Sequence, residues 1–528
     1  MADSTNPTPA QKAAARRSRA FMVVAAVLVL MALPLNIRIG RLQRRGPAHT
    51  DISIGRDIPG TLYLPVKADL DRFPRPPAKG DRPPVIVIAH GYSADQQIMS
   101  ALARSLANAG YAVVTFDFRG HGSNTRAFQG DLTDDVDAVV DWVETSPYVD
   151  ASRMAILGHS MGAGAVLEFA TKDDRPKAVI PLSGGWELND AVVPAHTFFL
   201  DAKGDPGEIR DRQDELTHDL RAEGADVQHQ ELGGLDHVTI LWSGKTVAAI
   251  TTFLDPILHV DRAEGDTPGI EDPRLATAVL YLLVALGLMA VVGSVSARLV
   301  PAGDADGTDA PSWSGYVVVG GALLLTMPLL ASTQLDPLPL GATQSIVLQF
   351  ALASAVIWAC RELARRDQLG GPVARWLDDK RPWLPLREVG WPGLAAGVAT
   401  VVLLLPLSNV FHRLVPTPER AVYWVVTTLL VLPFFAAFEA LLRRGDPKRA
   451  AGRGALGRLL LLVLTFVGLA IGALPSVIGL VLPLLVLQFV VLEVVAAGAY
   501  AKARNAAVIA VVDSVFLGWL AIVLTPIS

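Results

Sequence analysis

The sequence predicts two fold classes in one chain, an α/β domain that faces water and an all-α domain that spans a membrane. Between about residues 46 and 270, short β-rich runs alternate with amphipathic stretches, which is typical of a mostly parallel sheet. After Leu275, uncharged apolar runs of about 20 residues follow in quick succession. Hydrophobic residues make up 51% of the 528 residues, more than soluble proteins usually contain.

Nine runs are long and apolar enough to cross a bilayer. The first, FMVVAAVLVLMALPLNI, lies near the N-terminus. The others are expected at residues 275–297, 314–332, 344–363, 391–411, 421–442, 457–474, 477–499 and 506–526. Any single run could be a buried core helix, but eight runs joined by short polar loops favour a membrane domain over 275–528.

The first apolar run could be a cleaved signal peptide or a retained anchor. Four basic residues precede it, as in a signal peptide. The run is longer than a usual signal core, however, and no small-x-small cleavage site follows before Arg38. We therefore expect a transmembrane anchor at 20–37 after a cytoplasmic tail at 1–19.

The loops between the spans alternate in charge, and basic loops stay on the cytoplasmic side. Lys and Arg number seven in 361–390, six in 443–458 and two in 501–505, against none in 333–343 or 475–476 and two in 412–420. Counting back through the spans places the N-terminus inside and the water-facing segment outside the cytoplasm. The basic residues just after the first span, from Arg38 to Arg45, weaken the charge difference across that span but do not change the orientation that all the loops together indicate.

The water-facing segment is expected to form a domain at 46–260, followed by a linker at 261–274. Its eight expected strands are residues 51–54, 61–64, 84–89, 111–116, 153–157, 177–182, 196–200 and 226–232. The formal net charge of −5, without clusters of basic and aromatic residues, gives no indication of nucleic-acid binding.

The run RMAILGHSMGAGAVLEF contains a G-x-S-x-G motif around Ser160. The motif alone is weak, but here a β-rich stretch precedes it and good helix formers follow. This strand, turn and helix setting is that of a nucleophile elbow. Ser160 would then present its hydroxyl at the carboxyl edge of the sheet.

A serine nucleophile needs a histidine base that a carboxylate holds, in the chain order Ser, acid, His. Asp205 follows the HTFFL strand and His237 follows the last strand, so both are expected at the same sheet edge. Asp201 is a rival acid nearer the strand end. Three other histidines fit less well, because they start a strand (His196), lie in a polar helix (His218) or lie within a strand (His229).

An oxyanion needs two backbone N–H donors, one after the nucleophile and one in the loop after the third strand. We expect these donors at Met161 and Tyr92. His90 and Gly91 would shape the second loop. His159 is interpreted as a packing residue.

Together, AHGYSAD, FDFRGHGSN, ILGHSMGAGA, AKGDP and GLDH make residues 46–260 resemble the α/β-hydrolase superfamily, and in particular its capless esterases and its dienelactone-hydrolase-like and lipase-like members. The resemblance implies an α/β-hydrolase fold with an eight-stranded, mostly parallel sheet, and a Ser, Asp, His triad without metal or cofactor. It also implies a structural turn at Asp117, Arg119 and Gly120. Only SGGWELNDAVVPA separates the sixth and seventh expected strands, which is too short for a helical lid, so we expect an open site unless the membrane domain covers it.

The sequence thus predicts a membrane-anchored serine hydrolase that acts outside the cytoplasm on an acyl ester, thioester or amide, with the bilayer and a lipid or lipid-linked substrate as its partners. Two alternatives remain: an acyltransferase that uses the same acyl-enzyme, and a transporter or scaffold with a hydrolase-like binding domain.

Three carboxylates, Glu439, Glu493 and Asp513, fall inside expected spans, where ionisable residues are functional candidates. Each lies near the cytoplasmic end of its span. We therefore favour side chains that reach the membrane interface over a polar cluster inside the bundle.

Overall fold

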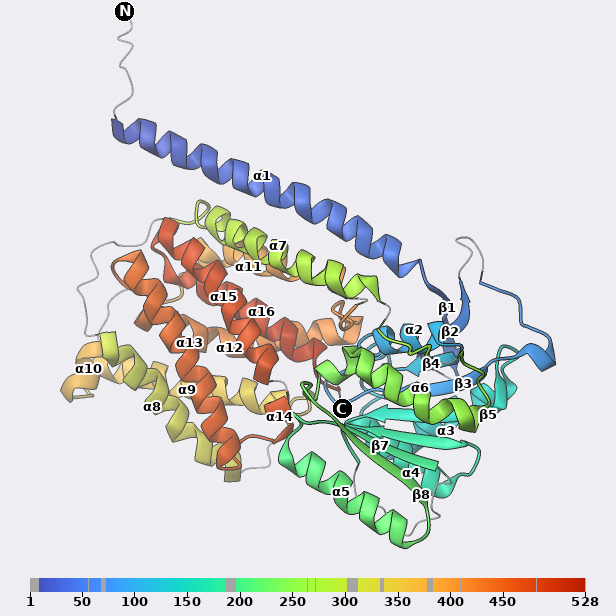
Figure 1. The fold of residues 1–528 in the computed structure, drawn as a ribbon. Helices are drawn as coiled ribbons and strands as arrows, with labels where there is room; N and C mark the ends of the chain where they lie inside the picture. Colours follow the sequence, from blue (N-terminus) through green and yellow to red (C-terminus); the bar gives the residue numbers. More distant parts are fainter. Residues whose placement is uncertain are drawn as a thin grey trace, which may run out of the picture.

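The protein folds as an α/β domain joined to a bundle of long helices (Figure 1). A computed structural model describes residues 9–55, 57–67, 73–185, 196–263, 265–270, 272–301, 312–332, 337–377, 383–408, 410–480 and 482–527.

The α/β domain is built on one eight-stranded sheet with the order β1-β2-β4-β3-β5-β6-β7-β8. The strands are β1 (Pro47–Ile54), β2 (Ile58–Lys67), β3 (Pro84–Ala89), β4 (Ala112–Phe116), β5 (Asp150–His159), β6 (Ala178–Leu182), β7 (His196–Ala202) and β8 (Asp226–Leu232). Strands β3 to β8 are parallel, whereas β2 is antiparallel to both of its neighbours. All eight expected strands are confirmed, and the fold class with them.

Helices cover both faces of this sheet and bury its apolar side chains in two cores. On one face lie α2 (Ser100–Asn108) and α6 (Gly244–Leu258); on the other lie α3 (Thr133–Thr145), α4 (Met161–Lys172) and α5 (Gly207–Ala222). In α3, the buried valines 136, 139, 140 and 143 recur at helical spacing. The carboxyl ends of the parallel strands are left to the loops, and these loops carry the site described below.

The rest of the chain is helical. The helices are α1 (Pro9–Gln43), α7 (Pro273–Ser296), α8 (Ser312–Ser332), α9 (Thr343–Arg365), α10 (Gly371–Leu377), α11 (Leu386–Val402), α12 (Pro418–Leu442), α13 (Pro447–Ala470), α14 (Val477–Leu480), α15 (Leu482–Ala503) and α16 (Ala506–Val523). Within the described ranges, nine helices are long and apolar enough to span a bilayer, one for each expected span. They indicate a multi-pass membrane protein.

Some helices extend beyond the apolar runs. Helix α13 begins at Pro447, ten residues before the expected span, because the Asp446 side chain accepts hydrogen bonds from the Lys448 and Arg449 amides and Pro447 fits the first helical turn. The short helix α10 was not expected from the sequence. Helix α1 is a single helix of 35 residues, much longer than the expected anchor, and it contacts α7 (Figure 1).

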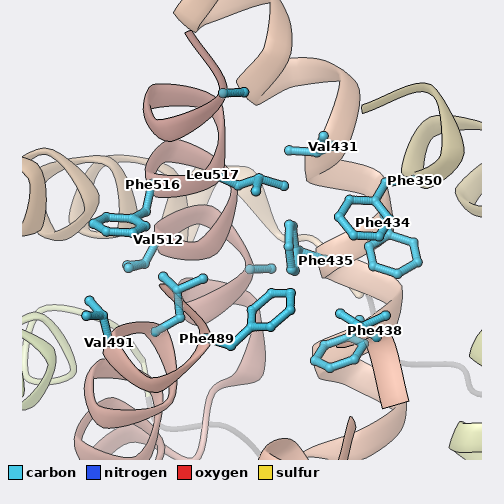
Figure 2. Close-up of a cluster of buried hydrophobic side chains, with 14 of the residues drawn as sticks. Phe350, Val431, Phe434, Phe435, Phe438, Phe489, Val491, Val512, Phe516 and Leu517 are labelled. Atoms are coloured by element: carbon cyan, nitrogen blue, oxygen red, sulfur yellow. The ribbon is translucent and has the colours of Figure 1, made fainter. Parts of the chain in front are cut away.

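Helix α16 lies inside the bundle, packed against α11 and α12, and its residues from Ala507 to Trp519 are all buried. Beside it, Phe350 of α9 packs against Phe434 and Phe435 of α12, and Phe438 follows them along α12 (Figure 2). The Phe350 and Phe434 rings are stacked with centroids 4.4 Å apart. Because α16 is almost entirely apolar, burial on all sides leaves few of its side chains without apolar contacts.

Within the described residues, α1, α7 and α12 contact the α/β domain through hydrogen bonds at Arg104, Ser100 and Gly120. Three further contacts come from segments outside the helices. The Asp95 carboxylate accepts a hydrogen bond from the Arg413 amide at 2.6 Å and pairs with His412 at 3.0 Å. Burial opposes ionisation of this pair, but mutual attraction prevails: the pKa of Asp95 falls to about 2 and the pKa of His412 is raised. The other two contacts join Gly120 to Ile527 and Tyr92 to Ala342, each through a backbone group of the bundle.

These contacts come from the α8–α9 loop, the α11–α12 loop and the segment after α16. In an alternating set of nine spans, all three belong to the same end of the bundle, which is also the end where α1 leads into β1. The loops rich in Arg and Lys belong to the opposite end. The α/β domain therefore sits at the end opposite the loops rich in Arg and Lys, although the basic residues from Arg38 to Arg45 also lie at its own end.

Candidate active site

Ser160 occupies the sharp turn between β5 and α4. Its backbone has φ 53° and ψ −117°, a strained conformation for a residue other than glycine. A Cβ atom at Gly162 would lie 2.6 Å from the His90 carbonyl oxygen, and one at Gly158 would overlap the backbone of Gly162. The turn thus requires both glycines of the motif, and it holds the Ser160 side chain at the carboxyl edge of the sheet.

The structure brings His237 and Asp205 to Ser160. His237 Nε2 lies 3.0 Å from Ser160 Oγ, and His237 Nδ1 lies 2.7 Å from Asp205 Oδ1. The second oxygen of Asp205 accepts hydrogen bonds from Ser183 Oγ at 2.7 Å and from the Ala202 amide at 2.8 Å. Although burial raises the pKa of Asp205, the hydrogen bonds from His237 and Ser183 outweigh it and lower this pKa. Asp205 is therefore an ionised, fully bonded carboxylate.

The other acid and the other histidines that follow Ser160 lie elsewhere. Asp201 is fully buried and its Oδ2 lies 2.9 Å from His229 Nε2. Burial outweighs this contact and raises the pKa of Asp201 to about 6. His196 pairs with Asp226 at 2.7 Å, and His218 is exposed on α5. The structure brings neither Asp201 nor these histidines into contact with Ser160 within its described contacts.

The two expected oxyanion donors lie next to the serine, one in sequence and one across the site. Met161 is the first residue of α4, directly after Ser160. Tyr92 follows Gly91, whose Cβ position would lie 3.2 Å from Ser160 Cβ. The Tyr92 carbonyl accepts a hydrogen bond from His121 Nε2 at 2.8 Å, and this bond fixes the loop. Both backbone segments therefore border the serine hydroxyl.

The histidines beside the site hold backbone in place. His90 Nδ1 donates to the Gly91 carbonyl at 2.8 Å, and its Nε2 accepts from the Phe118 amide at 3.0 Å. Burial lowers the pKa of His90 to about 4, so its ring is neutral at physiological pH. His159 Nε2 lies 2.8 Å from the His237 carbonyl, and the two ring centroids lie 4.8 Å apart with the ring planes tilted by 45°. These contacts agree with the structural roles expected for both residues.

The turn expected at residues 117 to 120 is also structural. Asp117 accepts hydrogen bonds from the Gln96 and Ser123 amides at 2.9 and 2.8 Å. Arg119 pairs with the buried Asp135. Gly120 has φ +74°, and a Cβ there would lie 2.7 Å from the Ile527 carbonyl oxygen of the bundle.

Ser160 and His237 are buried, with exposed fractions of 7% and 8%. The membrane bundle contacts the neighbouring loop, where the Ala342 amide donates to Tyr92 Oη at 2.9 Å. The sequence predicted an open site unless the membrane domain covers it. The segment between β6 and β7, on which the expectation of a missing lid rested, includes residues 186–195, which lie outside the described residues.

Ser183 is a site residue that the sequence did not reveal. It follows β6 in a positive-φ conformation and donates to Asp205. The next residue, Gly184, accommodates the backbone of Ser160, since a Cβ there would lie 2.5 Å from the Ser160 carbonyl oxygen. The sequence signal that could have indicated Ser183 is the Ser-Gly-Gly run at the end of β6, the strand that pairs with β5, which bears the nucleophile.

The three intramembrane carboxylates lie in a polar cluster within the bundle, so the expectation of side chains at the membrane interface was wrong for the buried Glu439 and Asp513. They form one cluster with two arginines of the same bundle end: Arg458 lies 3.1, 3.0 and 2.7 Å from Glu439, Glu493 and Asp513, and Arg443 pairs with Glu439 and Glu493. The side chains of Glu439, Asp513 and Arg443 are 0% exposed. In a low-dielectric interior, a carboxylate that is paired with a guanidinium group has a lower free energy than an isolated carboxylate.

Among the described residues, no three His, Cys, Asp or Glu side chains form a group that could hold a metal ion.

Part of the chain is similar to known proteins. Residues 81–202 match the family described as "Serine aminopeptidase, S33". An uncharacterized protein of Mycobacterium tuberculosis is 30% identical over 196 residues, which cover 35% of this chain and 68% of that protein. Cutinase est2 of Thermobifida alba is 30% identical over 173 residues, covering 31% of this chain and 55% of the cutinase.

Other similarities are more partial. An uncharacterized 31.7 kDa protein of Escherichia coli is 30% identical over 111 residues, 20% of this chain, and the chain spans only 39% of that relative. Among solved structures, an esterase of Pyrobaculum calidifontis has 18% identity and a TM-score of 0.33, covering 45% of this chain and 93% of the esterase. A putative dienelactone hydrolase of Klebsiella pneumoniae has 16% identity and a TM-score of 0.32, covering 40% and 98%.

Proposed function

Because the chain belongs to the α/β-hydrolase superfamily and has esterase-like serine hydrolase homology, we propose that it cleaves an acyl ester outside the cytoplasm through Ser160, His237 and Asp205. The observation that carries this proposal is the continuous chain of hydrogen bonds from Ser160 Oγ through the His237 ring to Asp205. Acyl transfer to serine requires a serine that is hydrogen-bonded to a histidine, which is in turn hydrogen-bonded to an ionised carboxylate.

In the proposed mechanism, Ser160 Oγ attacks the acyl carbonyl while His237 Nε2 takes its proton. Asp205 keeps the proton of the ring on Nδ1 and stabilises the imidazolium. His237 then protonates the leaving alcohol. Water, activated by the same histidine, hydrolyses the acyl-enzyme and regenerates Ser160.

The oxyanion of each tetrahedral intermediate would accept hydrogen bonds from the Met161 and Tyr92 amides. The N-terminus of α4 points at the same position, and its partial positive charge favours the developing anion. The hydrogen bond from the Ala342 amide to Tyr92 Oη fixes the Tyr92 side chain against the bundle, and this supports a rigid position for the Tyr92 amide, the second oxyanion donor.

The proposed location follows from charge and attachment. The loops with many Arg and Lys residues belong to the end of the bundle away from the α/β domain, and such loops favour the cytoplasm. The domain at 46–260 would then face the outside, with the tail at 1–19 inside, the anchor at 20–37, the linker at 261–274 and the membrane domain at 275–528.

Labelling with a fluorophosphonate probe tests the nucleophile. We expect the protein, purified in detergent, to be phosphonylated at Ser160, as located by peptide mass spectrometry, and to hydrolyse p-nitrophenyl acetate. The Ser160→Ala variant should lose both properties. Equal labelling of the two proteins would reject the proposed nucleophile.

A further inference from the structure

A polar pocket lies where the first two spans of the chain meet the α/β domain. Its walls include β1 and β2, α2 and the loop before it, and the adjoining ends of α1, α7 and the α11–α12 loop. Figure 1 shows α1 leading into β1 with α7 alongside it. The pocket has a volume of about 540 Å³, within the range of about 300–1,000 Å³ that is usual for small-molecule sites.

The charged side chains of this pocket are mostly positive. Arg104, Arg274 and Arg413 line it, against a single aspartate, Asp51, among its described lining residues. Arg104 and Arg274 are 3% and 2% exposed, so their charges are buried in the wall. Asp272 pairs with Arg274 and neutralises it. Within the described part of the chain, however, no carboxylate pairs with the guanidinium group of Arg104 or Arg413, so positive charge remains.

The guanidinium groups of Arg104 and Arg413 also have unused donors. Arg104 donates to three backbone carbonyls at the end of α1, among them that of Gln43 at 3.4 Å, but its Nε has no hydrogen-bond partner within the described residues. The Nε of Arg413 has none there either. The C-terminus of a helix supplies only about half a negative charge, so these carbonyls do not balance Arg104. A bound anion would lower the free-energy cost of burying this cation.

Two pKa values indicate the same positive potential. Burial and then the charge of Arg274 lower the pKa of Arg104 to about 10. Burial also lowers the pKa of His49 on the pocket wall, and the charges of Arg104 and Arg274 lower it further, against a hydrogen bond to a backbone carbonyl that raises it. His49 is therefore neutral at physiological pH. The attraction for an anion thus comes from the arginines.

The pocket lies at the depth of lipid head groups. Gln43 on its wall ends α1, and Arg274 on its wall is the second residue of α7. Six residues further into each helix, or about 9 Å, the apolar side chains of Ile37 and Leu280 are exposed. The head-group layer on each side of the hydrocarbon core is about 5–8 Å thick. A lipid whose phosphate occupies the pocket therefore has exposed apolar faces of α1 and α7 beside it for its acyl chains.

The pocket is separate from the proposed reaction centre. Thr61 of β2 lines it, whereas Ser160 follows β5, and three strand spacings separate these two strands in the sheet. At about 4.8 Å for each spacing, the strands are about 14 Å apart. The ester groups of a phospholipid lie only a few bonds from its phosphate, so a lipid held here does not present its esters to Ser160.

We propose that this pocket binds the phosphate of an anionic phospholipid, with the guanidinium groups of Arg104 and Arg413 as its charged contacts. Guanidinium groups bind phosphate oxygens through paired, charge-assisted hydrogen bonds. The bound lipid holds the α/β domain against the membrane surface beside α1 and α7. This site does not depend on the proposed hydrolase activity.

Native mass spectrometry of the full-length protein in detergent tests the site, because it gives the Kd of the first bound lipid. We expect phosphatidylglycerol to bind at least about tenfold more tightly than phosphatidylcholine, whose choline cation the arginines repel. Arg413→Gln removes a charge-assisted hydrogen bond and should raise the Kd for phosphatidylglycerol about tenfold. Gln97→Glu, which places a negative charge on the pocket wall, should raise this Kd at least as much.

The matched control is Arg44→Gln, because Arg44 is an exposed arginine next to Gln43 that does not line the pocket. It should leave the Kd within about twofold of wild type. Thermal unfolding checks that each variant is folded. A Kd that neither Arg413→Gln nor Gln97→Glu changes, or an equal change in Arg44→Gln, would overturn the site.

Two comparisons of ligands identify what the pocket recognises. Equal affinity for phosphatidylcholine and phosphatidylglycerol would contradict selection of a net negative charge. We expect sn-glycerol 3-phosphate, which carries a phosphate without acyl chains, to bind far more weakly than the lipid, and an equal Kd for the two would overturn the lipid as the source of the phosphate. None of these measurements uses Ser160, so their failure would leave the proposed function standing.

Discussion

Replacing Asp205 with asparagine tests the role of the carboxylate most sharply, because the surrounding donors dictate how the amide must lie. Ala202 N–H and Ser183 Oγ both donate to Asp205 Oδ2. The backbone N–H cannot become an acceptor, so the asparagine oxygen must face Ala202. The asparagine NH₂ must then face His237 Nδ1.

This orientation forces His237 into the wrong tautomer. With an NH₂ donor at Nδ1, the ring proton moves to Nε2, and Nε2 can no longer accept the proton of Ser160. In a serine protease, the equivalent change lowers kcat by about 10⁴-fold, or about 5.4 kcal/mol of transition-state stabilisation. We expect Asp205→Asn to lose activity on this order, with KM little changed.

The assay is hydrolysis of p-nitrophenyl acetate by the purified protein, with thermal unfolding as a check that the variant is folded. Asp201→Asn is the matched control, because Asp201 lies in β7, four residues before Asp205, but its carboxylate pairs with His229. It should stay within about threefold of wild type, well below the effect of a lost catalytic group. The reasoning would be refuted by an Asp205→Asn variant within tenfold of wild type, or by an equal loss in Asp201→Asn.

Three further outcomes follow. Ser183→Ala removes one of the hydrogen bonds to Asp205 and should lower kcat by about tenfold, equivalent to about 1.4 kcal/mol, with KM retained; an unchanged kcat would count against it. Arg458→Met leaves the buried Glu439 and Asp513 and the partly buried Glu493 with one guanidinium, so it should destabilise the bundle by about 3–5 kcal/mol. This loss would be seen as a lower Tm in detergent, whereas Arg449→Met, at an exposed residue, should have little effect. The Tm difference between wild type and His412→Gln should be largest between about pH 4 and 6.5. The pKa of His412 is raised in the folded protein, so its stabilising effect is complete below the ordinary value of 6.5 and is lost as the pH rises above that value. The pKa of Asp95 is lowered to about 2, so its stabilising effect is lost as the pH falls from about 4 towards 2. A difference that grows above pH 7 would contradict this pairing.

The sequence predicted the parts of the site that follow from strand ends. Ser160, Asp205 and His237 each come just after a β-rich run, and parallel strands end at one edge of a sheet. The choice between Asp205 and Asp201 was open, because both lie near the end of β7. The pairing of β7 with β8 resolves the position of Asp201, whose side chain contacts His229 of the adjacent strand.

Other features depend on contacts that sequence patterns do not encode. Ser183 resembles any loop serine until its hydroxyl is placed beside Asp205. Arg443 and Arg458 were counted as loop charges, yet helix α13 starts early enough to carry Arg458 into the bundle. The carboxylates they bind lie on α12, α15 and α16, so the cluster depends on how the helices pack.

The same limit applies to Gln488. A single glutamine in an apolar run is unremarkable in sequence, because such side chains usually find a partner on a neighbouring helix. Within the part of the chain that the structure describes, the buried Gln488 amide has no hydrogen-bond partner, and this depends on how α9, α15 and α16 pack around it.

The most direct test of the account uses a membrane-impermeant fluorophosphonate on right-side-out membrane vesicles, comparing wild type with Ser160→Ala. The account predicts that intact vesicles label wild type fully, that permeabilisation adds no further label, and that Ser160→Ala stays unlabelled. Labelling only after permeabilisation would contradict the extracytoplasmic location, and equal labelling of the two proteins would contradict Ser160 as the nucleophile.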